Sequence, residues 1–386
     1  MSKHYIKCFP VDNGDTTLLK LKDNSSILID CKIRDGVETD DGRKMYAVKD
    51  DLLSELERRD DNPTLDLFIL THSDKDHCQG FDKNFYTGAP KKYSKSNREN
   101  GEIMVDELWV TSMIFNHADN PDAEAIQKEA GRRLKLWQAD DPSKNTSGNR
   151  LRMIGYDEDE RYESLLNSVP GETVNNIGGE EKEDFQFFVH APFKQSLIDS
   201  NAKKEHNGSS IVLQARFKAS ASDEEYACFA MFGGDADHYR WEQVLEKSRN
   251  NGNEDKLKWD LFMTPHHCSW TYFNDVKYKD NPEPKDYSLK ILDYKVGSGK
   301  IIAPSKPIKD NDDTPPHFPA KEEYLKKVSN AKDFIELAKY PNEKAPKPYV
   351  FEITAQGPKE RKDKQGSALA SAGGAFGSVN RKSEYG

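Results

Sequence analysis

The chain has 386 residues, of which 35% are hydrophobic and 32% charged, and its formal net charge at pH 7 is -10. This composition predicts a globular protein with a sizeable core and excludes a wholly disordered chain. The acidic balance argues against a long basic groove for duplex nucleic acid, and no apolar run approaches the roughly 18 residues that span a bilayer, so we expect no membrane segment.

The five cysteines are scattered without a CxxC pair, and the N-terminal sequence MSKHYIKCFP lacks the apolar region of a signal peptide. Scattered cysteines of this kind are typical of proteins in a reducing compartment. We therefore expect a cytoplasmic protein.

Strand-forming segments open the chain. These segments are HYIKCFPV, TTLLKLK and SSILIDC, and the turn-forming sequences DNGD and DN separate them. Three strands joined by short turns predict a β-meander. A helix is predicted over residues 46–59. The apolar segment LDLFIL then predicts a buried strand that leads directly into the sequence THSDKDHCQG.

Residues 86–178 are polar and charged, interrupted by the strand-like DELWVTSMI, and we interpret them as an insertion over the core. Strand-rich sequence resumes at DFQFFVHAP and continues through SSIVLQARF, EYACFAMFGG, WDLFMT, GKIIAPS and PYVFEIT. Residues 356–386 are poor in large apolar groups, which predicts a flexible tail after one domain over residues 1–355. Two strand-rich halves with interspersed helices predict an α/β fold of two packed sheets covered by helices.

The loop after LDLFIL places His72, Asp74, Asp76 and His77 within six residues. A surface turn or a helix cap is the simpler explanation for Ser73 and Asp74. A divalent metal, however, needs imidazole nitrogens and carboxylate oxygens converging at about 2.0–2.2 Å. Four such groups on one short loop can supply ligands to two adjacent ions.

Further ligand-type residues lie next to later predicted strands. His206 precedes SSIVLQARF, Asp235 follows EYACFAMFGG, and His266 and His267 follow WDLFMT. Any one of these histidines alone is more often a structural residue. Their shared position at strand ends predicts that they converge with the first cluster.

The order His-x-x-x-Asp-His, then a His before GSSIVL, then GGDAD and PHHCS resembles the metallo-β-lactamase superfamily, whose first motif is usually His-x-His-x-Asp-His. More narrowly, the chain resembles the soluble metallohydrolase domain of the DNA-uptake protein ComEC and its stand-alone relatives. Four segments carry this resemblance: VDNGDTTLLKL, ILIDCK, TPHHCS and IIAPSKPIKDNDDTPPHFPAKEEYL. The resemblance covers roughly residues 4–330. It implies an αββα sandwich, in which two mixed β-sheets pack face to face with helices on the outer faces.

The same resemblance implies two divalent metal ions, zinc or manganese. The first would be held by His72, Asp74 and His206, and the second by Asp76, His77 and His267 (or His266), with Asp235 bridging the two ions. Asp74 stands where the family usually has a histidine. A carboxylate makes this first site harder, which favours Mn²⁺ over Zn²⁺ without excluding zinc.

Such a pair of cations lowers the pKa of a bridging water, so the resemblance implies hydrolysis by a bridging hydroxide. Asp76 would orient the hydroxide. His317, in PPHFP, could donate a hydrogen bond to the developing negative charge, although a histidine beside prolines is equally often structural. Relatives of this type are associated with nuclease or phosphodiesterase activity, so DNA or RNA is the expected substrate.

Basic sequence at residues 91–98 and 131–137, with Trp137 for stacking, could contact nucleic acid, although such runs are more often solvated surface. Two alternatives stay open. One is a hydrolase of a small ester, lactone or nucleotide signal. The other is a catalytically silent, metal-binding regulatory subunit in which Asp74 marks lost activity. Related stand-alone enzymes occur among bacterial antiviral defence components, where a regulatory protein partner can gate activity.

Overall fold

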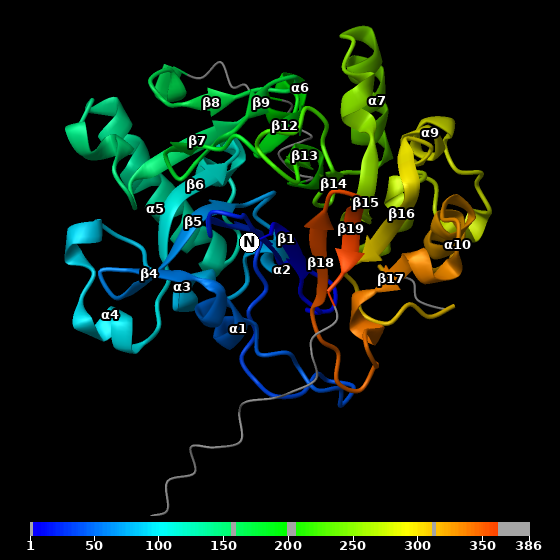
Figure 1. The fold of residues 1–386 in the computed structure, drawn as a ribbon, viewed down its shortest axis with the longest axis horizontal. Helices are drawn as coiled ribbons and strands as arrows, with labels where there is room; N and C mark the ends of the chain where they lie inside the picture. Colours follow the sequence, from blue (N-terminus) through cyan, green and yellow to red (C-terminus); the bar gives the residue numbers. More distant parts are fainter. Residues whose placement is uncertain (1–2, 156–159, 199–205, 311–313, 362–386) are drawn as a thin grey trace, which may run out of the picture.

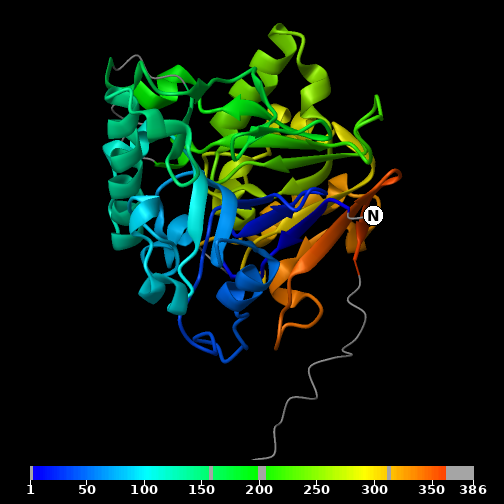
Figure 2. The same cartoon turned by 60° about the vertical axis from the view of Figure 1, so that its left-hand side comes forward.

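The structure is a computed structural model that describes residues 3–155, 160–198, 206–310 and 314–361 (Figure 1). It has a mixed α/β architecture with two large mixed sheets. Figure 2 shows the green strands of the second sheet above the blue strands of the first. The helices lie outside both sheets.

The first sheet has ten strands. Their order is β19 (Gly357–Glu360), β18 (Tyr349–Thr354), β1 (Tyr5–Cys8), β2 (Thr17–Lys20), β3 (Ser26–Ile29), β5 (Asn62–Ile69), β6 (Met104–Val110), β7 (Arg150–Ile154) and β8 (Asn167–Ser168), with β4 (Glu57–Arg59) paired to β5. Strands β1, β2 and β3 are antiparallel, which confirms the predicted meander. Strands β3, β5, β6 and β7 are parallel.

The second sheet has seven strands. Their order is β17 (Phe334–Glu336), β16 (Lys295–Ala303), β15 (Trp259–Met263), β14 (Cys228–Phe232), β13 (Val212–Phe217), β12 (Phe185–Ala191) and β9 (Thr173–Val174). Strands β14 to β17 are parallel, and β13 runs antiparallel to β14. A separate two-stranded sheet pairs β10 (Asn176–Ile177) with β11 (Glu180–Glu181).

The helices of the described chain vary from single turns to five turns. They are α1 (Val48–Glu55), α2 (Lys75–Cys78), α3 (Phe81–Asn84), α4 (Lys95–Glu99), α5 (Pro121–Gln138), α6 (Lys194–Ile198), α7 (His238–Asn250), α8 (Pro265–Cys268), α9 (Asp286–Leu292) and α10 (Phe318–Lys327). Within the described residues, none is both long and apolar enough to cross a membrane.

One buried apolar cluster fills the space between the sheets. Ile6 and Leu67 enter it from the first sheet, and Phe187, Leu213 and Phe232 enter it from the second. Successive side chains of a strand point to opposite faces, so a strand covered on both sides needs apolar residues at nearly every position. This explains the apolar run Leu67–Phe68–Ile69 at the end of β5.

Helices cover the outer faces through two further clusters. On the first sheet, Leu18 and Phe68 pack with residues of α1, α3 and α5. On the second sheet, Phe262 packs with Trp241 of α7 and Tyr324 of α10. The four layers are therefore helix, sheet, sheet and helix, consistent with an α/β sandwich. The peripheral positions of α5 and α7 are visible in Figure 1.

Three predicted boundaries change in the structure. The helix predicted over 46–59 ends at Glu55, because residues 57–64 form a hairpin whose turn residues, Asp60 and Asp61, both have positive φ, as a type I′ turn requires. The predicted insertion 86–178 supplies β6, β7 and β8, so it extends the first sheet and does not simply cover the core. The predicted tail from 356 includes β19, while residues 362–386 lie outside the described part of the chain.

Asp260 on β15 provides a test of the packing of the second sheet. Its carboxylate accepts a hydrogen bond from the backbone N–H of Phe229 at 2.8 Å, and burial raises its pKa from 3.8 to about 6. The folded state thus binds this proton more tightly than the unfolded state, and stability is lost as pH rises from about 4 through 6. Asp260→Asn retains an acceptor oxygen. We expect it to raise the free energy of unfolding at pH 7.5 by up to about 3 kcal/mol, with little gain at pH 4.

Urea unfolding of the two proteins at both pH values measures this difference. Glu246→Gln, on the exposed side of α7, serves as the control for a lost carboxylate. An equal gain at both pH values would contradict the assignment to the buried carboxyl group.

Candidate metal centre

The loop after β5 brings two imidazoles together. Leu70 still pairs with β6, because its N–H donates to the Trp109 carbonyl at 3.0 Å. Thr71 leaves the sheet, and its N–H donates to Asp30 Oδ1 at 2.7 Å. His72 follows, and His77 lies on the single-turn helix α2, so that their ring centroids are 4.0 Å apart.

Asp235 lies at the centre of the cluster, on the turn between β14 and α7. Its Oδ1 is 3.0 Å from His77 Nε2 and 3.7 Å from His267 Nε2. Its Oδ2 is 3.6 Å from His72 Nε2 and 3.6 Å from His266 Nε2. Each carboxylate oxygen therefore faces two histidines, and the carboxylate joins the two halves of the cluster.

Several ligand-type atoms here are buried without a hydrogen-bond partner: Nε2 of His72, Nε2 of His77, Oδ1 of Asp235 and Oδ1 of Asp15. An unpaired buried polar atom costs about 1–3 kcal/mol. Their convergence is unfavourable unless protons or metal cations lie among them. The ligand atoms form two groups, each within 4.8 Å: His72, Asp74 and Asp235, and Asp15, His77, Asp235 and His267. The donor set fits a divalent metal centre.

Hydrogen bonds orient the imidazoles. His77 Nδ1 donates to Asp30 Oδ2 at 2.7 Å, and Nε2 faces Asp235, where it can bind a metal once its proton is displaced. Thr71 Oγ1 lies 2.6 Å from Asp30 Oδ2 and 3.1 Å from His72 Nδ1, so it can donate to the carboxylate and accept from the ring. A carboxylate or hydroxyl behind a ligating histidine is the usual arrangement at protein metal sites, because it fixes the tautomer.

His267 is held from behind in a similar way. Its Nδ1 lies 3.1 Å from the carbonyl of Pro304 and 3.1 Å from the backbone nitrogen of Gly14, and these two contacts hold Nε2 toward the cluster. This Nε2 also lies 3.0 Å from Asp76 Oδ2. The ring is therefore presented to the cluster with the atom that can bind a metal.

The electrostatics of the cluster are governed by burial and by mutual attraction. Burial raises the pKa of Asp235, but the facing histidines outweigh it and hold that pKa well below its ordinary value. Burial lowers the pKa of His77, but Asp235 and Asp30 hold it well above its ordinary value. Metal binding therefore has to displace protons from the imidazoles.

Two glycines allow the loops to approach the cluster. A Cβ on Gly14 would lie 2.4 Å from Lys32 Cδ and 2.7 Å from the Asp76 carbonyl. A Cβ on Gly234 would lie 2.9 Å from Thr71 Oγ1, and its φ is +48°. Only glycine permits both approaches without displacement of the ligand loop.

The loop after β15 is strained at the site itself. His266, His267 and Cys268 have φ values of 49°, 54° and 65°. Each left-handed residue costs roughly 1–2 kcal/mol. Surrounding bonds hold the turn, among them His266 N–H to the Gly234 carbonyl at 3.0 Å and His317 N–H to the Cys268 carbonyl at 3.0 Å. Strain of this kind concentrates at functional sites.

The structure brings together most of the predicted ligands. Asp74 and His72 lie in one group with Asp235, and His77 and His267 lie in the other. Asp76 contacts His267 but is absent from both groups. His266 faces the opposite oxygen of Asp235 from His267, so the two adjacent histidines lie on different sides of the cluster. The side chain of His206 lies outside the described part of the chain, although its backbone is in a short helix before β13.

His317 contacts the backbone that follows His267, since its own N–H donates to the Cys268 carbonyl at 3.0 Å. Its Nδ1 accepts the backbone N–H of Trp270 at 2.9 Å, so its proton is on Nε2. Ser269 Oγ lies 3.5 Å from the same Nδ1. The tautomer makes this imidazole a hydrogen-bond donor through Nε2.

Sequence reasoning missed Asp15 and Asp30 as site residues. Asp15 follows the turn-forming sequence VDNG, and Asp30 ends the strand sequence SSILID. Burial raises the pKa of Asp15 to about 6, and its Oδ2 is 3.7 Å from His77 Nδ1. Asp30 follows a predicted strand directly, as the strand-end rule requires, whereas Asp15 lies in the predicted turn before a strand and gave no such signal.

Of the two basic sequences predicted to contact nucleic acid, residues 131–137 make their contacts within the fold, whereas Lys91, Lys92 and Lys95 of residues 91–98 are exposed. Arg133 is fully buried and donates to the carbonyls of Val105 and Arg150, and Arg132 pairs with Glu129 at 2.7 Å. Trp137 lies under Lys144, whose Nζ is 5.0 Å from its ring. Residues 131–137 therefore stabilise α5 against the sheet and do not form a basic patch.

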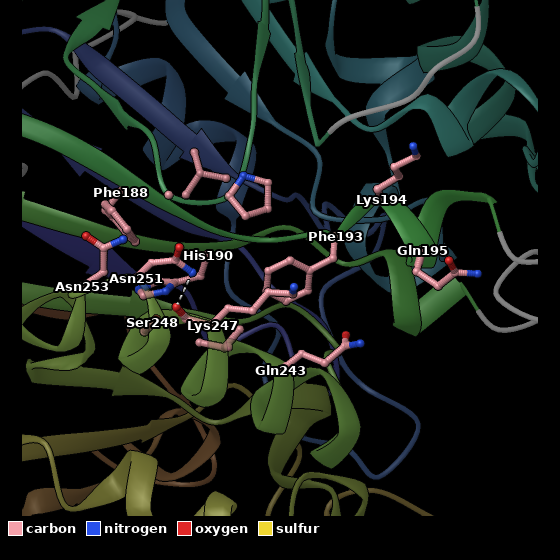
Figure 3. Close-up of a pocket in the computed structure, with 14 residues that line it drawn as sticks. Phe188, His190, Phe193, Lys194, Gln195, Gln243, Lys247, Ser248, Asn251 and Asn253 are labelled. Carbon is pink, nitrogen blue, oxygen red and sulfur yellow. Dashed lines mark hydrogen bonds between the residues drawn. The ribbon is translucent and has the colours of Figure 1, made fainter.

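A cavity of about 610 Å³ lies between β12, α6 and α7, apart from the cluster (Figure 3). Lys247, His190 and Phe193 line it together with several amide side chains. No member of either ligand group is among its lining residues. It is therefore not the place where metal chemistry would occur.

Comparison with protein-family models yields no match, and comparison with curated proteins yields none either.

Asp30 provides a test of the cluster as a metal centre. Asp30→Asn removes the negative charge behind His77 but keeps the shape, and asparagine tolerates the positive φ of 53° at this position. We expect metal affinity to fall by about 10- to 100-fold, the usual effect of losing a supporting carboxylate. Competition with a chromophoric chelator measures it.

Asp66→Asn is the matched control, since Asp66 is also buried in the first sheet but pairs with Arg59. It should reduce stability and leave metal affinity unchanged. Unchanged affinity in Asp30→Asn would show that His77 is not a ligand.

Proposed function

We propose that this protein is a metal-dependent hydrolase of the metallo-β-lactamase fold, similar to the stand-alone ComEC-type metallohydrolases, and that it cleaves phosphodiester bonds. The observation that carries the proposal is the set of unpaired, buried nitrogens and oxygens around Asp235. The four-layer arrangement and the position of the ligands at strand ends support it.

His72, Asp74 and Asp235 would hold one cation, and Asp15, His77, Asp235 and His267 would hold the other. When bound, divalent cations of this kind lower the pKa of water and offset the negative charge that builds on a phosphoryl oxygen. Zinc and manganese both suit this mixed nitrogen and oxygen donor set.

The exposure of each side chain decides whether it can contact the substrate. The side chains of Asp74 and Asp76 are 37% and 35% exposed, whereas those of His77 and Asp235 are 0% and 3% exposed. Substrate therefore has to approach from the side of the two exposed carboxylates. Asp76 would accept a hydrogen bond from the attacking water and orient it. His317 would donate from Nε2 to the developing negative charge.

Removal of a central ligand tests the centre. Asp235→Ala and His72→Ala should each abolish phosphodiesterase activity and lower bound metal, because each removes an atom that faces the cluster. Elemental analysis of the purified proteins, together with hydrolysis of labelled DNA, RNA and a generic phosphodiester, measures both effects. Screening small esters and lactones in parallel would identify the alternative substrate class.

His190→Gln is the control for losing a buried histidine, since His190 lies away from the cluster and Gln can still donate to the Lys256 carbonyl. It should retain metal and activity. Full metal content in both ligand variants would exclude the proposed centre.

Asp74 should tune the choice of metal. Asp74→His restores the usual superfamily residue beside His72, replacing an oxygen donor with a nitrogen donor and removing a negative charge. We expect the ratio of zinc to manganese affinity to rise, with activity retained. Chelator competition and rates across both metal concentrations measure it. A silent regulatory subunit predicts instead a wild-type protein with no activity at any concentration of either metal.

A further inference from the structure

A pocket of about 280 Å³ lies directly beside the histidine and aspartate cluster. Its lining runs from Trp270 to Lys279 and includes His317. Thr271, in the lining, has its Oγ1 3.3 Å from Nδ1 of His266, whose Nε2 faces Asp235. The pocket and the cluster therefore share a wall.

The aromatic walls of the pocket are held in place by hydrogen bonds. Trp270 donates its backbone N–H to His317 Nδ1 and its indole N–H to the Val276 carbonyl at 3.0 Å. The rings of Tyr278 and His317 have centroids 5.2 Å apart. Tyr278 is half-buried, so part of its ring is accessible from the pocket. A flat ligand group would meet preformed walls and would not need to order them.

The charge of the pocket is positive in a chain whose net charge is -10. Lys277 and Lys279 are exposed on either side of Tyr278. The one carboxylate in the lining, Asp275, lies 3.6 Å from Lys285 Nζ and 3.6 Å from His238 Nε2. Lys285 offsets its charge, and an anionic group near the two lysines is favoured.

We propose that this pocket binds a nucleoside phosphate unit, with the base against Tyr278, the phosphates near Lys277 and Lys279, and the buried Trp270 supporting the wall from behind. Aromatic rings next to lysines are the combination that holds nucleotides without reading a sequence, because every base has a flat face and every phosphate a negative charge. The inference rests on the proposed function and assigns its substrate class: phosphodiesters that carry a nucleoside beside the scissile bond.

Calorimetric titration of the metal-loaded protein tests the pocket without measuring activity. Adenosine 5′-monophosphate and ribose 5-phosphate carry the same phosphate, and only the first has a base. We expect the nucleotide to bind at least about fivefold more tightly, the lower end of one base-to-aromatic contact. Equal affinities would overturn the inference. A single-stranded DNA decamer, titrated in parallel, distinguishes a site for nucleic acid, which it should occupy more tightly than the mononucleotide, from a site for free nucleotides.

Variants locate the binding. Tyr278→Leu should lose the advantage of the nucleotide over ribose phosphate, whereas Tyr294→Leu, another half-buried tyrosine beside α9, should keep it. The double substitution Lys277→Gln with Lys279→Gln alters only exposed side chains and should weaken both ligands about equally. An unchanged preference in a folded Tyr278→Leu protein, or unchanged affinities in the lysine variant, would contradict the assignment.

Activity separates the two proposals. If the protein binds the base but hydrolyses no phosphodiester, the proposed function fails and the nucleoside site stands. If it hydrolyses generic phosphodiesters and shows no preference for the nucleotide, the proposed function stands and the pocket is not a base site. If both hold, Tyr278→Leu should raise KM for the DNA decamer more than it lowers kcat.

Discussion

The arrangement of this molecule depends on one buried carboxylate, that of Asp235, facing four imidazoles. A carboxylate cannot be buried alone, because desolvation of its charge costs several kcal/mol even after relaxation of the surroundings. The rings of His72 and His77, with centroids 4.0 Å apart, repel one another when both are protonated. Asp235 and the histidines are therefore stable only as a group, or with cations among them. The ends of β5, β14 and β15 have to meet for that group to exist.

The parts of the molecule around the cluster hold it in one geometry. Asp30 and Thr71 act through the first sheet, and the Pro304 carbonyl acts through the second, so each sheet orients the rings that it contributes. The backbone is left-handed at residues 266–268, and neighbouring segments approach closely at Gly14 and Gly234. The packing of the two sheets offsets the energetic cost of this strained backbone. Ligands set in advance in this way lose little freedom on binding, which is how metal sites gain affinity and selectivity.

The exposure of the ligands is graded across the cluster, and this gradient links the fold to its proposed chemistry. His72 and His77, which follow β5, and the central carboxylate of Asp235 are inaccessible. The side chains of Asp74, Asp76 and His266, in contrast, reach the surface. The pocket of Trp270 and Tyr278 shares a wall with His266 on this accessible side. Binding and chemistry would thus be adjacent, and the segment that follows the PHHCS sequence would serve both, because it leaves the cluster and forms the pocket wall within a few residues.

The sequence by itself determined the alternation of apolar residues in the strands and the position of ligand-type residues at their ends. His72, Asp74, His77 and Asp235 were found in this way, because a strand end is a local property. Asp15 and Asp30 were not, because each lies more than forty residues from His77 in sequence, and they come near it only when β2 pairs with β3 and β3 with β5. The same limit applies to residues 131–137: the charges of Arg132 and Arg133 are local, but Glu129 and the sheet carbonyls that satisfy them are brought near only by helix formation and packing. Tertiary structure also separated His266 from His267, since the left-handed turn at these residues directs adjacent side chains to opposite oxygens of Asp235.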